Sequence, residues 1–343
     1  MKRRVHISVC TDMDVLAEDI LNSGGVLMLP CGTSINQYII QKLADLGIEY
    51  VWVTSDTEQL TYTNSLNFEK KYEKNIEALK HLVLDMIRGK KIDHTVMSNI
   101  TDSVISSLEE PEHVIACLGK IRETDDYTYY HCVNVSFYSM LIAGWLNLSR
   151  DDIRTVLQAG LLHDVGKAKI PNELLNKKEK LSEQEFDLIK RHTIYGYEMV
   201  KNDPKICRYI KDVILMHHER EDRSGYPLQA DGEELGLHTK IVAVADVYDA
   251  MTSQRPYKKA LTPFEAFEEF MTVCRGRMDM HIVNTLLYNL SRYYTGSRVL
   301  LSNGQTGNIA YIPPHCIWKP IVDTELGFLD LSREKEVFVT SMA

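Results

Sequence analysis

No stretch of the 343 residues approaches the ~18 consecutive apolar residues typical of a membrane-spanning helix, and the first residues lack the apolar centre of a signal peptide. The seven cysteines are scattered, odd in number and free of CxxC spacing. This pattern argues against a disulfide framework and against a cysteine-based zinc cluster. We therefore expect a cytoplasmic protein with reduced thiols and no membrane association.

An excess of positive charge is also missing. Lysine and arginine number 39 against 48 aspartate and glutamate residues, which gives a formal net charge of -9. We do not expect such a protein to bind duplex nucleic acid or an anionic membrane surface over a broad face. An anionic ligand would need basic side chains gathered locally. Hydrophobic residues make up 44% and charged residues 25%, an ordinary globular composition.

The chain divides into four segments by pattern. Residues 1–56 mix short strand-like runs with a helical stretch, as in a small α+β module that could be regulatory. Residues 57–95 are lysine-rich with apolar residues at helical spacing, which predicts a linker helix able to pair with a second copy of the chain. Helical periodicity dominates residues 96–295. The pattern of residues 296–343 predicts a small β-rich segment with a hairpin at Asn303-Gly304. The predicted fold class is mainly α.

Histidine and aspartate side chains recur on the apolar side of the predicted helices in residues 96–295. One example is the sequence LLHDVGK, where an apolar helical run ends on an adjacent histidine and aspartate. The inward-facing set is His131, His163, Asp164, His192, His217, His218 and Asp246.

A single inward histidine is more often a hydrogen-bonded core residue than a metal ligand. Five histidines and two aspartates in one helical interior are different, because each would be costly to desolvate without a strong partner. A pair of divalent metals supplies such partners together, and a carboxylate can bridge two ions. Imidazole and carboxylate ligands alone admit several transition metals, including zinc and nickel.

The ordered series of motifs resembles the HD-domain metal-dependent phosphohydrolases, and specifically their HD-GYP branch. The resemblance covers roughly residues 110–294 and rests on the HD doublet at 163–164, HHE at 217–219, GYP at 225–227 and RPYK at 255–258. It implies an HD-type helical bundle. It also implies hydrolysis of cyclic di-GMP, or a related cyclic dinucleotide such as 3′,3′-cGAMP, to pGpG or GMP by a hydroxide held between two metals.

The resemblance also implies the metal ligands. His131, His163, Asp164 and Asp246 would hold one metal, and His192, His217 and His218 the second, with Asp164 bridging. Some members of the family bind a third metal through a glutamate four residues before the first histidine, where this chain has Tyr127. We therefore expect two metals, and the family favours iron or manganese.

Four residues are predicted to contact the substrate, and each has a simpler alternative. Lys167 would bind the phosphate or protonate the leaving oxygen, or only offset the helix dipole, an effect of about 0.3–1 kcal/mol. Arg255 and Lys258, three residues apart, would clamp a phosphate or lie on a solvated helix edge. Tyr226 would stack on a guanine or contact phosphate, or only anchor its loop.

The GYP loop departs from the family pattern in two places. Arg223 stands where the family usually has glycine, and Glu221 where an aromatic residue is common. If that glycine serves a turn with positive φ, arginine strains or reshapes the loop. These changes bear on turnover, on substrate preference and on docking of a diguanylate-cyclase-domain protein at the loop.

Two other functions fit the same residues. The chain could be a receptor that binds cyclic di-GMP with little or no turnover and signals through residues 1–56, or an HD phosphohydrolase acting on mononucleotides. The product, the cyclic dinucleotide, the metal, the signal and the oligomeric state are left open by the sequence.

Overall fold

The computed structural model describes residues 2–11, 14–22, 25, 27–55, 62–109, 114–115, 118, 127–177, 179–252 and 261–342. The chain folds into two compact units. One is helical and comprises Tyr62–Leu261 and Glu268–Leu287, and the other comprises Met1–Thr61, Thr262–Phe267 and Tyr288–Ala343. None of the described helices is both long and apolar enough to cross a membrane.

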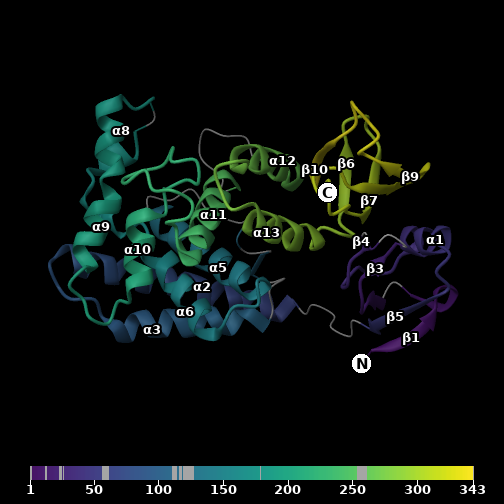
Figure 1. Cartoon of the computed structure of the whole chain (residues 1–343), viewed down its shortest axis with the longest axis horizontal. Helices are drawn as coiled ribbons and strands as arrows, with labels where there is room; N and C mark the ends of the chain where they lie inside the picture. The colour runs from purple at the N-terminus through teal and green to yellow at the C-terminus, as the bar shows by residue number, and fades with distance from the viewer. Residues whose placement is uncertain are drawn as a thin grey trace. The chain divides into compact units, whose positions relative to one another are not determined.

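The helical unit is built around one helix, α5 Tyr127–Trp145 (Figure 1). Its helices and 3-10 helices are α2 Tyr62–Ile87, α3 His94–Ile105, η2 Ser106–Glu109, α5 Tyr127–Trp145, α6 Arg150–Leu162, η3 Val165–Lys169, α7 Asn172–Leu175, α8 Glu183–Lys190, α9 His192–Val200, α10 Arg208–Met216 and α11 Leu237–Thr252. Two further helices, α12 Pro263–Cys274 and α13 Met280–Arg292, contribute to both units.

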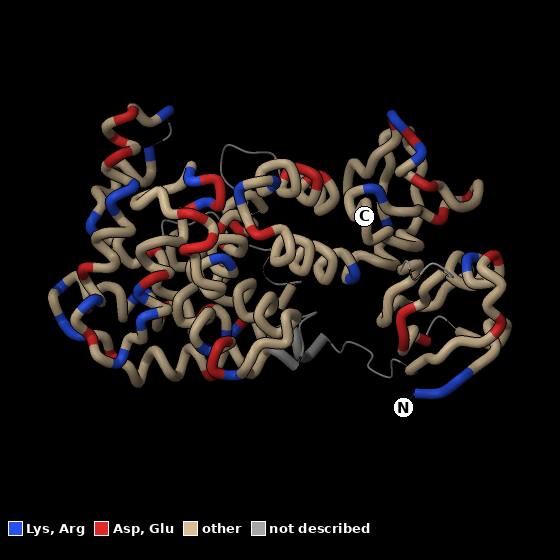
Figure 2. Tube along the Cα trace, viewed as in Figure 1, with Lys and Arg blue, Asp and Glu red and all other residues tan. Residues whose placement is uncertain are grey.

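The central helix α5 contains no Lys, Arg, Asp or Glu, whereas the helices around it carry them (Figure 2). A helix that is apolar on all sides is stable only when it is buried. Accordingly α2, α6 and α11 pack on α5. Gly160 allows α6 to approach closely, because a Cβ there would lie 2.8 Å from the Cα of Ser136.

Helix starts in this unit follow the signals in the sequence. Ser149 caps α6 by accepting from the backbone N–H of Asp152. Ser182 and Glu185 form a complete capping box at the start of α8. At Arg191 the helical segment is divided into α8 and α9, although no glycine or proline stands at that position.

The second unit contains two antiparallel sheets and a two-stranded pair. Its elements are β1 Arg3–His6, η1 Ile7–Val9, β2 Asp14–Leu16, β3 Ile20–Leu21, β4 Leu27–Leu29, α1 Gln37–Asp45, β5 Tyr50–Ser55, β6 Arg298–Leu301, β7 Thr306–Tyr311, β8 Ile321–Thr324, β9 Gly327–Asp330 and β10 Val339–Met342. The strand orders are β1-β5-β2, β3-β4 and β10-β6-β7-β8-β9. The predicted hairpin is confirmed: β6 and β7 pair on either side of Gly304, whose φ is 84°.

The first and last parts of the chain share a hydrophobic core. Ile39 and Leu43 of α1 belong to the same buried cluster as Tyr311 and Ile321 of the C-terminal sheet. Asn36 ties the two parts together, because its side chain caps α1 at Ile39 and also donates to the carbonyl of Ala310 at 2.6 Å. The mainly α fold class, with a small sheet at each end of the chain, is confirmed.

Candidate metal centre

The seven predicted ligands converge in the interior of the helical unit. His131 lies on α5, His163 and Asp164 follow α6, and His192 opens α9. The remaining three are His217 and His218, at the end of α10, and Asp246 of α11. Six of the seven residues are at most 6% exposed, and His218 is partly buried.

A first group gathers around one oxygen of each aspartate. The Oδ2 of Asp164 lies 3.3 Å from the Nε2 of His163 and 3.7 Å from the Nε2 of His131. The Oδ1 of Asp246 lies 3.0 Å from the Nε2 of His131 and 3.8 Å from the Nε2 of His163. Two imidazoles and two carboxylates therefore face a common point.

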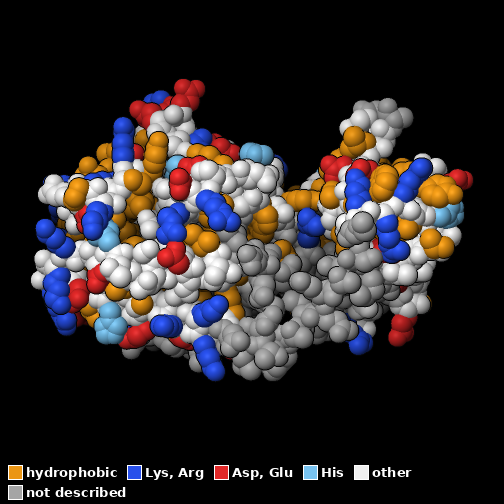
Figure 3. Space-filling model, turned by 90° about the horizontal axis from the view of Figure 1, so that it is seen from below, with side chains coloured by type: hydrophobic (Ala, Val, Ile, Leu, Met, Phe, Trp, Pro, Cys, Tyr) orange, Lys and Arg blue, Asp and Glu red, His pale blue; other side chains and the backbone are white. Residues whose placement is uncertain are grey.

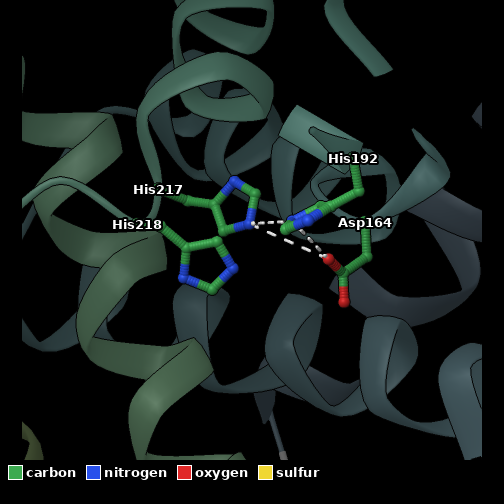
Figure 4. Close-up of side chains that lie close together, drawn as sticks. All are labelled: Asp164, His192, His217 and His218. Carbon is green, nitrogen blue, oxygen red and sulfur yellow. Dashed lines mark hydrogen bonds and ion pairs between the residues drawn. The ribbon is translucent and has the colours of Figure 1, made fainter. Parts of the chain in front are cut away.

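A second group gathers around the other oxygen of Asp164. This Oδ1 lies 3.2 Å from the Nε2 of His192 and 3.8 Å from the Nε2 of His217. His218 completes the group, with one ligand atom from each of the four residues within 4.8 Å of the others. Figure 4 shows the three imidazoles turned toward the carboxylate. Because its two oxygens face different groups, Asp164 has the geometry of a bridging ligand.

Backbone carbonyls fix the tautomer of three of these histidines. The Nδ1 atoms of His163, His192 and His217 contact the carbonyls of Gly160, Ile189 and Val213 at 2.7, 2.6 and 3.1 Å. A carbonyl only accepts, so each Nδ1 carries the proton that is donated. In the neutral ring each Nε2 then presents a lone pair to the interior, the arrangement typical of metal-ligating histidine.

Several of these inward atoms have no protein partner that satisfies them. The Nε2 atoms of His192 and His217 lie 3.4 Å apart, and two lone pairs at that distance repel unless a cation lies near both. Among the described residues, the Nε2 of His163 and the Oδ1 of Asp164 are buried without a hydrogen bond. Buried polar atoms normally have partners. The residues therefore fit divalent metals, which would satisfy all four atoms.

The carboxylates of the site are held in their charged form. Burial by itself raises the pKa of Asp164, but the charges of Lys167 and His163 outweigh it and hold that pKa well below its usual range. The same opposition keeps the pKa of Asp246 well below its usual range, mainly through the hydrogen bond from His131. Ionised carboxylates are the form that binds a metal.

The two groups differ in the pKa values of their histidines. Burial lowers the pKa of both His131 and His163. Asp246 and Asp249 outweigh this effect for His131, and Asp164 with Cys132 outweighs it for His163, so that each pKa is raised to about 10. In the second group, burial and the neighbouring histidines hold the pKa of His217 well below its usual range, and burial lowers that of His218 to about 3. His217 and His218 therefore favour the neutral form, whereas the first group attracts positive charge.

Two carboxylates that support the candidate site were not identified from the sequence. Asp249 accepts from the Nδ1 of His131 at 2.7 Å and so orients that ring from the far side. Glu219 is 2% exposed and accepts the backbone N–H groups of Leu228, Gln229 and Ala230 at 2.6 to 3.1 Å. It thereby holds the segment that follows GYP. The sequence motifs that could have pointed to them are HHE, whose third residue is Glu219, and ADVYDAM, whose second aspartate is Asp249.

Lys167 lies directly beside the proposed bridging ligand. Its Nζ donates to the Oδ2 of Asp164 at 2.5 Å, and its side chain is 23% exposed. It also lines a cavity of about 280 Å³ together with Asp164, Tyr129 and Lys80. The cation predicted to meet the substrate therefore reaches both the candidate metal centre and an open space.

The other predicted substrate contacts have different outcomes. The ring of Tyr226 stacks on His218, with centroids 4.7 Å apart and planes at 29°, and so lies against the second group. Arg255 and Lys258 lie outside the described residues, as does the side chain of Tyr127. Their predicted roles remain predictions.

The GYP loop has, at Arg223, a backbone conformation that glycine favours. Arg223 has φ 63°, in the left-handed region, as expected if the family glycine serves such a turn. Its guanidinium pairs with Asp231 through Nε at 3.0 Å and Nη2 at 2.5 Å, and its side chain is 66% exposed. Glu221 pairs with Lys240 at 2.8 Å. Both unusual residues are thus tied to neighbouring charges.

Comparison with known proteins agrees with this geometry. Residues 118–282 match the family model described as HD domain. This part of the chain is an HD domain. It carries all seven candidate ligands, so the resemblance seen in the sequence is confirmed. The solved structure of Bd1817, an HDG"Y"P protein from Bdellovibrio bacteriovorus, aligns with 84% of this chain and 99% of its own, at a TM-score of 0.57 and 16% identity, which shows the shared fold.

Curated relatives match a larger part of the HD-domain chain. A cyclic di-GMP phosphodiesterase of Pseudomonas aeruginosa is 35% identical over 232 residues, 66% of this chain and 56% of the relative. A cyclic di-GMP phosphodiesterase response regulator of Xanthomonas campestris is 42% identical over 171 residues, 49% and 44% of the two chains. A 3′3′-cGAMP-specific phosphodiesterase of Vibrio cholerae is 32% identical over 176 residues, 49% and 39%. The chain thus spans about half the length of these relatives.

Proposed function

We propose that the HD-domain chain is a metal-dependent phosphodiesterase that hydrolyses cyclic di-GMP, or a related cyclic dinucleotide such as 3′,3′-cGAMP, to pGpG or GMP. The observation that carries the proposal is the position of Asp164, whose two buried oxygens face two separate groups of imidazole nitrogens. The relatives named above as cyclic-dinucleotide phosphodiesterases support the choice of substrate.

The proposed cofactor is a pair of divalent transition metals, with iron or manganese favoured by the family. His131, His163, Asp164 and Asp246 would hold one ion, and Asp164, His192, His217 and His218 the other. When bound, such a pair supplies Lewis acidity that lowers the pKa of water and neutralises charge on a phosphate.

The remaining work falls to side chains of this chain. Lys167 has its ammonium beside Asp164 and is one of the residues that line the cavity, so it would bind a phosphate oxygen or give a proton to the departing sugar oxygen. Tyr226 lies against His218 and offers an aromatic surface for a base. Arg255 and Lys258 would clamp the phosphate.

An anionic substrate would be attracted by positive charge at the site and not by a broad basic face. Figure 3 shows basic side chains interspersed with acidic and apolar ones over the face that it draws. Attraction of a dinucleotide would then come from individual cations at the site, above all Lys167, whose pKa is raised because the charge of Asp164 outweighs the effect of burial. A homodimer through α2, and docking of a diguanylate-cyclase-domain protein at residues 221–227, remain predictions from the sequence.

The test is a product assay on the full chain. Protein loaded anaerobically with Fe²⁺ or Mn²⁺ is incubated with cyclic di-GMP or 3′,3′-cGAMP, and the products are separated by ion-exchange chromatography. The His163→Ala/Asp164→Ala variant is the control for contaminating activity. We expect linear dinucleotide or GMP from the wild type only. Tight binding without product under both loadings would instead support a receptor, and hydrolysis of mononucleotides alone would support a different HD phosphohydrolase.

A further inference from the structure

A buried chain of hydrogen bonds connects helix α2 with the candidate metal centre. The hydroxyl of Tyr72 donates to the Oδ1 of Asn134 at 2.5 Å, and the Nδ2 of Asn134 donates to the Oδ1 of Asp249 at 2.9 Å. The Oδ2 of Asp249 accepts from the Nδ1 of His131 at 2.7 Å. All four residues are between 0% and 8% exposed.

The chemistry of the groups fixes the direction of each bond. An ionised carboxylate only accepts, so the Asn134 amide must present its NH₂ to Asp249 and its oxygen to Tyr72. For the same reason the Nδ1 of His131 carries a proton. On the other side of the ring the Nε2 of His131 faces the Oδ1 of Asp246 and the Oδ2 of Asp164, where a bound metal would take the place of a proton. Each link thus sets the orientation of the next.

The hydrogen bond that orients His131 differs from those that orient the other buried histidines of the centre. The Nδ1 atoms of His163, His192 and His217 bond to carbonyls three or four residues earlier in the chain, so each is oriented locally. His131 is oriented by Asp249, 118 residues away, and through it by a residue of α2. Tyr72 itself lies outside residues 118–282, which match the HD domain.

The ring of Tyr72 is firmly packed between α2 and α5. Its centroid lies 6.2 Å from that of Phe68 and 6.1 Å from that of Phe137. Movement of α2 along α5 would therefore carry the hydroxyl away from Asn134. The buried amide oxygen would lose its donor, which costs about 1–3 kcal/mol when nothing replaces it.

We propose that Tyr72 is a positioning residue for the first ligand group. Through Asn134 and Asp249 it holds the Nε2 of His131 toward Asp164 and Asp246, so that metal affinity at this group depends on where α2 lies. The inference rests on the proposed function only in requiring that the centre binds two ions.

The test compares two tyrosines that join the same pair of helices. Tyr72→Phe removes the hydroxyl from which the series of buried hydrogen bonds begins. Tyr130→Phe is the matched control, because the hydroxyl of Tyr130 also bridges α5 and α2, donating to Glu73 at 2.9 Å on the exposed side. Metal-free full-length protein is titrated with Mn²⁺ while free Mn²⁺ is followed by electron paramagnetic resonance. The melting temperature of the metal-free protein is measured in parallel.

We expect two Mn²⁺ ions in the wild type, and in Tyr72→Phe one ion bound as before and one bound about tenfold more weakly, the usual effect of losing a group that orients a ligand. Tyr130→Phe should bind both ions as the wild type does. A second variant, Asn134→Ser, should weaken the same ion, and adding Tyr72→Phe to it should have no further effect.

Unchanged binding of both ions by Tyr72→Phe would overturn the inference. So would an equal weakening of both ions together with a lowered melting temperature, because that result describes a general loss of structure. If the wild type binds fewer than two ions, the metal pair of the proposed function fails instead, and the two failures are thereby distinguished.

Discussion

Asp164 is the residue that both groups of candidate ligands share. Its Oδ1 faces His192 and His217, its Oδ2 faces His163 and His131, and Lys167 donates to the same Oδ2. A fully buried carboxylate among so many ring nitrogens is stable only if positive charge is present. The three candidate sources are the lysine, protons on the histidines, and metal ions.

Replacement of Lys167 separates binding of metal from catalysis. Lys167→Ala should keep its metals, because both oxygens of Asp164 stay available to them, but lose about 100-fold in kcat, the usual cost of removing a group that stabilises transition-state charge. Lys169→Ala, in the same 3-10 helix but exposed, is the control. An unchanged rate in Lys167→Ala would return the lysine to a role in helix-dipole compensation.

Protons and metals should compete for the first group. His131 and His163 have pKa values raised to about 10, so in the metal-free protein both rings favour the protonated form at neutral pH. Metal binding must displace those protons, and affinity should rise with pH up to about that value. Calorimetric titration in buffers of different ionisation enthalpy measures the protons released. Release of none would contradict the assignment of these two rings as ligands.

At the scale of elements, η3 brings the HD doublet against α9. A Cβ on Gly166 would lie 1.9 Å from the carbonyl oxygen of His192 and 2.4 Å from the backbone nitrogen of Gly196. The two backbones can meet at this distance only because the residue has no side chain. The placement of His192 relative to Asp164 therefore depends on a glycine that is not itself a ligand.

Gly166→Ala should push α9 away from η3. We expect a loss of about 1–3 kcal/mol in the free energy of unfolding from overpacking, and weaker metal binding at the second group. Gly236→Ala is the control, since a Cβ there meets nothing within 4 Å. Denaturant unfolding and metal titration of the two variants give the comparison. Equal stabilities would show that the backbones can separate without cost.

The sequence predicted which histidines and aspartates gather in the interior better than it predicted what orients them. The periodicity around His131 and the doublet at His163 placed both rings inward, because helical spacing determines which face a residue occupies. The break at Arg191 carries no glycine or proline signal. Asp249 is three residues after Asp246 on α11, but its contact with His131 depends on packing between α5 and α11, which no local pattern encodes.

At the scale of the whole molecule, the two ends of the chain fold together. The sequence patterns of residues 1–56 and 296–343 read as separate pieces, and nothing local shows that they share a core. The bond from Asn36 to Ala310 spans 274 residues. Stability of the first segment should therefore depend on the last.

Ile321→Ala tests that dependence. The side chain is 4% exposed in the shared core, and its truncation should cost about 2–5 kcal/mol within this unit. Hydrogen exchange should then accelerate in α1 as well as in β8, while α5 stays protected. Leu300→Ala, on the same sheet but 37% exposed, should change little. Unchanged exchange in α1 would mean that the two ends are stable independently.

The most direct test of the account is the metal content of the anaerobically loaded full-length chain, measured by elemental analysis beside the His163→Ala/Asp164→Ala variant. The account predicts two ions per wild-type chain and fewer than one in the variant, because the variant removes the carboxylate that both ligand groups share. A wild type that binds no metal, or a variant that retains both ions, would contradict it.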